Sequence, residues 1–332
     1  MQVTVLAGGI GAARFLRGLA GALRSTHEAS LITVIGNTGD DIRLFGLHVC
    51  PDLDSVMYTL GGGADDERGW GRKDESFTLL KELIAYGATP DWFSLGDRDF
   101  ATHILRTQML DAGYSLADVT TALSKRWQLP VRLIPMSNDR VETHVVVSDP
   151  ESADGASQAI HFQEWWVRHR AALPAREFVM VGAEHAKPAP GVLEAIAGAE
   201  VILFPPSNPV VSIGPILAVP GIKEALLASS APIVGISPIV GGAPVRGMAD
   251  ACLSAIGVEI SAQAVAGYYG ARSRGGLLDG WVVDRTDHES VEAIHDSGIH
   301  CVATNTIFER VSIARQVAEI AIDLGRRFGK AR

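Results

Sequence analysis

Residues 3–14 of this chain read VTVLAGGIGAAR, an apolar run that passes directly into a glycine-rich turn. Apolar residues at helical spacing follow between Phe15 and Leu23, so the turn is expected to open an amphipathic helix. A strand that enters a helix through glycines leaves backbone N–H groups free at the positive end of the helix dipole. The stretch therefore predicts a phosphate-binding loop, and a tight turn without a ligand is the competing interpretation.

The loop departs from two common nucleotide-binding patterns. Arg14 occupies the position of the third glycine in the dinucleotide pattern G-x-G-x-x-G. The Lys-Ser or Lys-Thr pair of a Walker loop is missing after the glycines. Phosphate binding is thus expected, but NAD binding does not follow from the loop.

Further short apolar runs alternate with helical patterns along most of the chain, and glycine or proline marks most of the junctions. This alternation predicts βαβ units, that is, an α/β fold with a buried and mostly parallel sheet. The expected strands are Val3–Ala7, Leu31–Gly36, Trp92–Leu95, Phe178–Val181, Val201–Phe204, Pro232–Ile236 and Trp281–Val283.

The middle of the chain has a different pattern. Val131–Ile134 and Val141–Val147 lie close together and predict a hairpin or a crossing pair of strands. We interpret residues 131–180 as an inserted cap subdomain. Residues 1–130 and 181–330 would then form the nucleotide-binding α/β domain.

Composition excludes several classes of protein. The 332 residues carry a formal net charge of −9, which argues against a nucleic acid or an anionic membrane as partner. The three cysteines are far apart and predict neither a disulfide framework nor a zinc site. We see no signal peptide and no uncharged apolar run of about 20 residues, the length that spans a bilayer. A cytoplasmic location is expected.

Four aspartates follow the second predicted strand. Asp40 and Asp41 belong to the turn GNTGDD, and Asp52 and Asp54 open a probable helix in CPDLDS. Turns at the carboxyl ends of neighbouring parallel strands meet at one edge of the sheet. Carboxylate oxygens suit Mg²⁺, which neutralises phosphates. As alternatives, Asp52 or Asp54 caps the helix and the Asp40 turn is simply solvated.

Three more polar segments are candidates for ligand contacts. In LGDRD, Arg98 would bind a phosphate while Asp97 and Asp99 bind a metal or a hydroxyl, or else an Asp–Arg pair caps the next helix. The segment GWGRK offers an aromatic ring and two cations. PPSNP follows another strand, and its proline-locked turn can present polar groups to a base or a phosphate.

These segments occur in one order over about 250 residues: GGIGAARFLRGL, NTGDD, CPDLDSVMYTL, GWGRKDESF, GDRDFATHILR, PMSNDRVETHV, FQEWW, PPSNPVVSIGPIL and SPIVGGAPV. The set resembles the CofD/FbiA family, the 2-phospho-L-lactate transferases of coenzyme F-420 biosynthesis. The NTGDD form and the extended GWGRKDESF segment look like the actinobacterial branch, which favours an enolpyruvyl donor. Each motif is short, and it is their ordered combination that is specific.

The resemblance implies a Rossmann-like three-layer fold with a smaller domain, commonly as a homodimer. It implies Mg²⁺-dependent transfer of a phosphoenolpyruvyl or 2-phospho-L-lactyl group. The donor is a guanosine diphosphate that carries the three-carbon acid. The acceptor is the ribityl hydroxyl of FO, the deazaflavin chromophore, and GMP leaves.

The resemblance also implies roles for individual residues. Asp40 and Asp54 are the expected metal ligands, with Asp54 orienting or deprotonating the ribityl hydroxyl and Arg98 offsetting charge on the leaving side. The residues expected to hold the nucleotide are Gly8, Gly9, Gly11, Ala12, Ser207, Asn208 and Pro209. Those expected to contact FO are Asp54, Trp70, Arg72 and Asp97, with Phe162, Trp165 and Trp166 as further candidates.

Two other classes of function compete with this interpretation. YvcK-like regulators share the glycine start and a similar fold but bind a nucleotide sugar, and the segments GDRDFATHILR and SNDRVETHV favour the transferase over them. A NAD-dependent oxidoreductase is disfavoured by Arg14 and by the lack of a proton-relay constellation. Fluorescence titration with FO distinguishes the transferase from the regulator.

Overall fold

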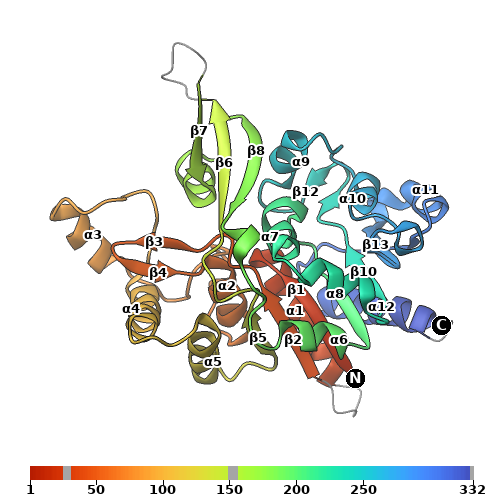
Figure 1. Ribbon diagram of the computed structural model, residues 1–332, viewed down its shortest axis with the longest axis horizontal. Coiled ribbons are helices and arrows are strands. Elements are labelled where there is room, and N and C mark those ends of the chain that lie inside the picture. The colour runs from red at the N-terminus through yellow and green to blue at the C-terminus, as the bar shows by residue number, and fades with distance from the viewer. Residues whose placement is uncertain (25–30, 149–155, 330–332) are drawn as a thin grey trace.

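The structure, a computed structural model, describes residues 1–24, 31–148 and 156–329. A seven-stranded sheet runs through it in the order β14-β13-β10-β9-β1-β2-β5, with every neighbouring pair parallel (Figure 1). This confirms the predicted α/β fold with its mostly parallel sheet. The strands are β1 (Gln2–Ala7), β2 (Leu31–Gly36), β5 (Arg132–Pro135), β9 (Val201–Phe204), β10 (Ile233–Ile236), β13 (Gly280–Asp284) and β14 (His300–Thr304).

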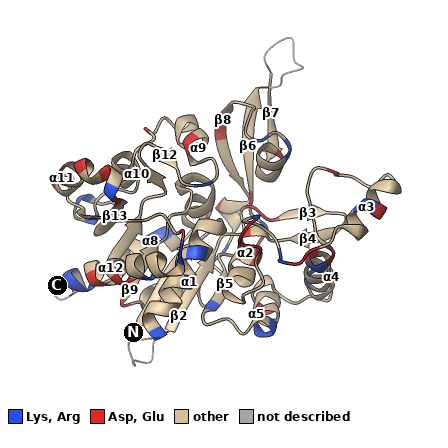
Figure 2. Ribbon diagram, turned by 180° about the vertical axis from the view of Figure 1, so that it is seen from behind, with Lys and Arg blue, Asp and Glu red and all other residues tan. Residues whose placement is uncertain are grey.

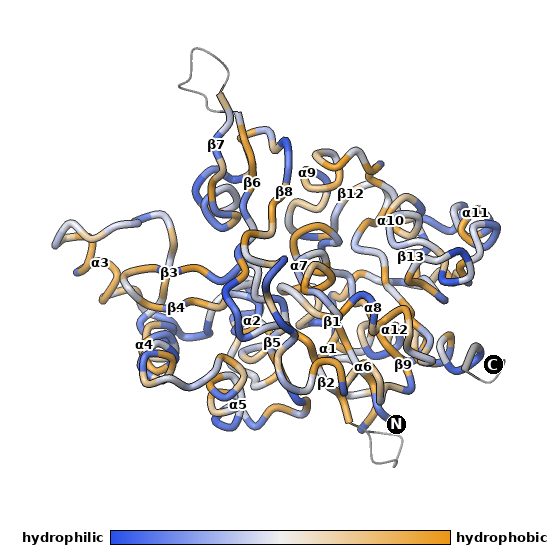
Figure 3. The backbone as a smooth tube through the Cα atoms, viewed as in Figure 1, coloured by the Kyte–Doolittle hydropathy of each residue, from blue (hydrophilic) through white to orange (hydrophobic). Residues whose placement is uncertain are grey.

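Helices cover both faces of this sheet, which gives three layers. Successive residues of a strand point to opposite faces, so Val3 and Val5 of β1 pack in one core and Leu6 packs in the other. The strands appear as hydrophobic segments in Figure 3. The helices on the Val5 side are α1 (Gly9–Arg24), α2 (Pro51–Leu60), α5 (Leu116–Trp127) and α12 (Val311–Gly329). Those on the Leu6 side are α6 (Val192–Ala197), α7 (Gly214–Ala218), α8 (Ile222–Ala228), α9 (Ala249–Ala255), α10 (Ala262–Tyr269) and α11 (Val291–Asp296).

A third, smaller core holds a hairpin and two helices together. The hairpin is β3 (Ile42–Leu44) with β4 (Leu47–Val49), and the helices are α3 (Thr78–Ala85) and α4 (Asp97–Asp111). This unit extends away from the main sheet in Figure 1. Its hairpin lies between β2 and α2 in the chain, and its two helices follow α2. The four aspartates flank the hairpin, at the end of β2 and at the start of α2.

A three-stranded antiparallel sheet follows β5 in the chain. It has the order β7-β6-β8, from β6 (Glu142–Ser148), β7 (Ser157–His161) and β8 (Ala175–Val181), and it projects from the main body in Figure 1. The two-stranded hairpin β11 (Ile239–Val240) and β12 (Ala243–Pro244) lies between β10 and α9. Residues 149–155, within the predicted subdomain, lie outside the described residues.

The strand prediction was wrong in the middle of the chain. The segments 131–134 and 141–147 do not form a hairpin, because β5 joins the main sheet beside β2 and β6 pairs with β7 and β8. Burial explains the difference: β5 is buried on both faces after its first residue, whereas every second residue of β6 is buried. The segment 178–181 is likewise part of antiparallel β8 rather than of the parallel sheet.

Trp92–Leu95 is a bend rather than a strand. Its aromatic residues favoured a strand prediction, but Trp92 and Phe93 pack against each other, with ring centroids 5.9 Å apart. Conversely, the edge strand β14 was not predicted, because it is a short run, HCVAT, whose apolar residues show no clear pattern.

Among the described residues, no single helix is long and apolar enough to cross a membrane. The bent pair 209–218 and 222–228 passes on length and composition alone. Its side chains Ile213, Ile216, Ile222 and Leu226 belong to the core beneath the sheet.

Candidate functional site

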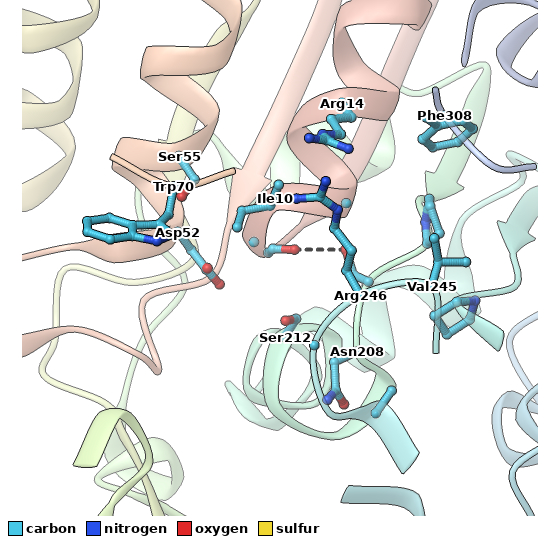
Figure 4. A pocket seen from close by; sticks show the side chains of 18 of the residues that line it. Ile10, Arg14, Asp52, Ser55, Trp70, Asn208, Ser212, Val245, Arg246 and Phe308 are labelled. Atoms are coloured by element: carbon cyan, nitrogen blue, oxygen red, sulfur yellow. Dashed lines mark hydrogen bonds between the residues drawn. The ribbon is translucent and has the colours of Figure 1, made fainter. Parts of the chain in front are cut away.

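A cavity of about 1110 Å³ opens at the carboxyl end of the main sheet (Figure 4). The loops after β1, β2, β9, β10 and β14 all contribute to its lining. Ligands of open α/β sheets bind at this edge, because the strand order reverses there and the loops diverge to leave a crevice. The sequence prediction that the glycine loop and the aspartate turn share one edge is therefore consistent with this geometry.

The glycine loop forms one wall of the cavity. Gly8, Gly9 and Gly11 line it, whereas Ala12 is buried behind them in the core. A side-chain carbon at Gly11 would lie 2.5 Å from the carbonyl oxygen of Pro206, closer than any real carbon contact. Only glycine therefore lets α1 begin this close to the turn after β9.

The turn after β9 forms the adjoining wall. The Ser207 hydroxyl donates a hydrogen bond to the Gly8 carbonyl at 2.9 Å, drawn as a dashed line in Figure 4. The Asn208 side-chain oxygen accepts from two backbone N–H groups of the short helix 209–213, at 2.9 and 3.3 Å. Ser207 and Asn208 line the cavity, and Pro209 is buried as the first residue of that helix. The Asn208 amide nitrogen is thus the group that this turn offers to a ligand.

Asp40 and Asp52 form a buried carboxylate pair next to the glycine loop, and Asp52 accepts a hydrogen bond from the Gly9 backbone N–H. The Asn37 amide nitrogen donates to both, at 3.3 Å to Asp40 and 2.8 Å to Asp52. Burial, reinforced by the nearby Asp41 carboxylate, raises the pKa of Asp52 to about 7, although Asn37 opposes this. Burial and then Asp52 raise the pKa of Asp40 well above its usual range. Asp40 and Asp52 are therefore residues that could hold a cation, which would offset their neighbouring charges.

Asp54 has a different environment from Asp52. It is paired with the Arg106 guanidinium through both of its oxygens, one at 3.0 Å, and His103 lies 3.7 Å away. Arg106 and Asp54 are almost completely buried, and Asp54 is absent from the cavity lining. Burial lowers the pKa of His103 to about 4 despite the attraction of Asp54, so His103 is uncharged near neutral pH. The charge of Asp54 is therefore neutralised by Arg106 alone. Asp54 thus links α2 to α4 through its ion pair with Arg106.

The predicted contacts in the LGDRD segment also lie away from the cavity. Asp97 accepts hydrogen bonds from the Ser76 hydroxyl at 2.7 Å and from two backbone N–H groups at the start of α3. These hydrogen bonds, that of Ser76 above all, lower the pKa of Asp97. Arg98 is exposed and donates to the Lys73 carbonyl at 3.2 Å. Arg72 donates to the Arg98 carbonyl at 2.8 Å and stacks on aromatic rings. These residues knit the 69–79 segment to α4.

Aromatic side chains line the part of the cavity beyond the carboxylates. Trp70 is 42% exposed and lies close to Asp52 and Ser55 in Figure 4. Trp166 and Phe93 also line the cavity, from the segment after β7 and from the 92–95 bend. Phe162 and Trp165, the other candidates, are fully buried in the core. The cavity therefore offers separate aromatic rings at its rim rather than the predicted cluster.

Arginines form a basic wall beside the glycine loop. Arg246 reaches from the turn before α9 toward Arg14 of α1, so that the two guanidinium groups face each other (Figure 4). Burial and then the charge of Arg246 lower the pKa of Arg14. Arg17 is fixed by Asp66 through two hydrogen bonds of 3.0 and 3.1 Å. Facing cations at the start of a helix predict an anionic ligand between them.

Sequence reasoning missed two features of this site. Asp52 and Asp54 lie two residues apart on α2, which places them on nearly opposite sides of the helix, so the sequence alone does not decide which one faces the ligand. Arg246 lies in GGAPVRG, where the glycines signalled a turn but gave no direction for the side chain. Figure 2 marks the acidic residues at the start of α2 and the basic residues of α1 along the ribbon.

The parallel sheet and the cavity at its carboxyl edge, lined by the glycine loop, arginines and buried carboxylates, define a class, a Rossmann-like α/β protein. The sequence profile described as "2-phospho-L-lactate transferase CofD" matches residues 3–320. The chain belongs to the CofD family of transferases. This confirms the resemblance carried by the ordered motifs.

Relatives in actinobacteria are similar over almost their whole length. The "Phosphoenolpyruvate transferase" of Streptomyces griseus is 62% identical, with 98% of each chain covered. The protein of that name from Streptomyces coelicolor is 60% identical, with 100% of each chain covered. The one from Mycolicibacterium smegmatis is 53% identical, over 92% of this chain and 94% of the relative.

Among solved structures, a protein of the UPF0052 family from Bacillus halodurans has a similar fold. Its TM-score is 0.59 at 21% sequence identity, covering 97% of this chain and 98% of that one. At this identity the likeness concerns the fold alone.

Proposed function

We propose that this protein transfers a phosphoenolpyruvyl group from a guanosine diphosphate-linked donor to the ribityl hydroxyl of FO, with release of GMP. The observation that carries the proposal is one cavity in which a glycine loop, a pair of facing arginines and a buried carboxylate pair converge. The family and the names of its relatives supply the chemical identity of the transferred group. The 2-phospho-L-lactyl group is the alternative cargo, since it differs from the enolpyruvyl group by two hydrogens.

The donor lies along the glycine loop in this proposal. Its diphosphate accepts hydrogen bonds from the N–H groups of residues 10 and 11 and faces Arg14 and Arg246, so that developing charge on the GMP side is neutralised. Asn208 offers its amide to the guanosine part. In this proposal Arg14 and Arg246 offset the charge on the leaving side, which was the role expected of Arg98 from the sequence.

Mg²⁺ fits the carboxylate pair of Asp40 and Asp52. Two buried carboxylates share one Asn37 amide, and burial together with the neighbouring carboxylates raises the pKa of both, which a bound cation would offset. Oxygen-only ligands match the preference of Mg²⁺. When bound there, the ion would neutralise phosphate oxygens of the donor. Asp52 thereby replaces Asp54 in the proposed site, because Arg106 already neutralises Asp54.

The acceptor lies on the aromatic side of the cavity. Trp70 and Trp166 offer apolar surface for the flat ring system of FO, and the ribityl chain extends toward Asp52. The hydroxyl oxygen of FO forms a bond to the distal phosphorus of the donor, and the bond from that phosphorus to the bridging oxygen of GMP breaks. The hydroxyl proton passes to Asp52. Phosphoryl transfer depends mostly on positioning and charge neutralisation, so a carboxylate within hydrogen-bond reach is sufficient.

The experiment combines the purified protein, Mg²⁺, FO and the enolpyruvyl-guanosine donor. We expect stoichiometric GMP and a product heavier than FO by the phosphoenolpyruvyl group. The lactyl donor, run in parallel, reports the preference between the two acids. No GMP and unchanged FO with either donor would refute the proposal. If a fluorescence titration then shows no binding of FO while a UDP-sugar binds tightly, the YvcK-like regulator class is supported instead.

A further inference from the structure

A second cluster of metal-ligating side chains lies on the other side of the Asp40 turn. The Asp41 Oδ2 atom is 3.1 Å from His48 Nε2 and 3.0 Å from Cys50 Sγ. One ligand atom from each of the three residues lies within 4.8 Å of the other two. These distances suit hydrogen bonds, and they are also short enough for the three atoms to share one ion.

The hydrogen bonds of the cluster use only one of the two carboxylate oxygens of Asp41. Asp41 Oδ1 is buried and has no hydrogen-bond partner among the residues that the structure describes. A purely hydrogen-bonded trio leaves this oxygen unsatisfied, and an unsatisfied buried acceptor is costly. An ion held by the carboxylate would engage it, since carboxylates bind metals through one oxygen or both.

The cluster also has room for a further ligand. A second cavity, of about 210 Å³, is lined by Asp41 and His48 together with polar residues such as Thr38, Asn138 and Glu142. Cys50 closes the site from the buried side, as a fully buried thiol. Three protein ligands with a position open to water is a common arrangement for zinc.

We propose that Asp41, His48 and Cys50 bind a transition-metal ion of the zinc class, separate from the Mg²⁺ at Asp40 and Asp52. The ligand chemistry divides the two sites: sulfur and imidazole nitrogen select zinc and similar ions, whereas the oxygen-only pair suits Mg²⁺. The odd, widely spaced cysteines gave no sign of such a site in the sequence, because only Cys50 takes part and the other ligands are a histidine and an aspartate.

The position of the site gives the ion a defined effect. It would link the Asp40 turn, strand β4 and Cys50, the residue directly before α2. These segments carry Asp40 and Asp52, so the ion would fix the spacing of the carboxylate pair without touching the substrates. Binding of this ion does not depend on the transfer reaction.

The test is a cobalt titration of chelator-treated protein in excess Mg²⁺, without substrates. Cobalt bound to a thiolate gives an intense near-ultraviolet charge-transfer absorption, and we expect it to saturate at one ion per chain. Zinc should displace the cobalt and raise the melting temperature. Cys50→Ser should abolish the band, and His48→Gln should weaken binding by at least about 10- to 100-fold, the effect known for lesser changes around metal ligands.

Cys301→Ser is the matched control, because Cys301 is also a buried free thiol but lies on β14, away from the cluster. It should bind cobalt as the wild type does. Circular dichroism shows whether each variant is folded, and His48→Gln, at a partly exposed site, keeps the test valid if Cys50→Ser does not fold. Absence of a thiolate band in the wild type, or equal affinity in folded His48→Gln, would overturn the proposal. Failure of the transferase assay alone would leave these results unchanged.

Discussion

Replacing Asp52 by Asn is expected to make the metal-free protein more stable at pH 8 while abolishing turnover. Burial raises the pKa of Asp52 from 3.8 to about 7, so the folded state binds this proton more tightly than the unfolded state. Stability must therefore fall as pH rises from about 4 to about 7. At about 1.4 kcal/mol for each pKa unit, the penalty reaches about 4 kcal/mol at pH 8. Relaxation of the site makes this an upper limit, so we expect a gain of about 1–4 kcal/mol.

Urea unfolding in EDTA, followed by circular dichroism at pH 5 and pH 8, measures this effect. The wild type should lose stability between the two pH values more steeply than Asp52→Asn, and Mg²⁺ should stabilise only the wild type. The matched control is Asp54→Asn on the same helix, which leaves Arg106 buried without its partner and should cost about 3–5 kcal/mol at both pH values. If Asp52→Asn were no more stable than the wild type at pH 8, the carboxylate pair would not be the strained cation site described above.

Three further substitutions test the walls of the cavity by steady-state kinetics. Gly11→Ala places a carbon 2.5 Å from the Pro206 carbonyl oxygen. The substitution should cost about 1–3 kcal/mol of stability and raise the KM for the donor. An unchanged KM would count against the glycine loop as the donor-binding site. Arg246→Ala is an exposed change that should alter stability by less than about 0.5 kcal/mol. Loss of its charged hydrogen bond should raise the donor KM about 10- to 100-fold, and an unaffected donor KM would place the phosphates elsewhere. Trp70→Ala should raise the KM for FO several-fold and leave the donor KM unchanged. The reverse pattern would mean that the donor, rather than FO, binds beside Trp70.

The glycine loop and the main sheet could be predicted because local signals decide them. The apolar run, the glycines and the helical spacing after them each point to the same strand–loop–helix unit. The mistaken hairpin at 131–147 shows the limit of such signals. Its two strands are neighbours in sequence, but β5 is drawn into the parallel sheet by burial on both faces.

The roles of the aspartates depended on tertiary structure. Nothing near Asp54 in the sequence reveals that Arg106, 52 positions later, turns toward it from α4. Asp40 faces the cavity as predicted by position, although its role as a metal ligand stays a prediction. The homodimer and the cytoplasmic location also stay predictions, since a single chain tests neither.

A crystal structure with GDP, FO and Mn²⁺ in place of Mg²⁺ would locate the cation and both ligands together, because anomalous scattering identifies manganese. We predict manganese between Asp40 and Asp52, the diphosphate against residues 8–11 and Arg246, and the FO ring beside Trp70. Manganese bound to Asp54, or a nucleotide outside the cavity, would contradict the account.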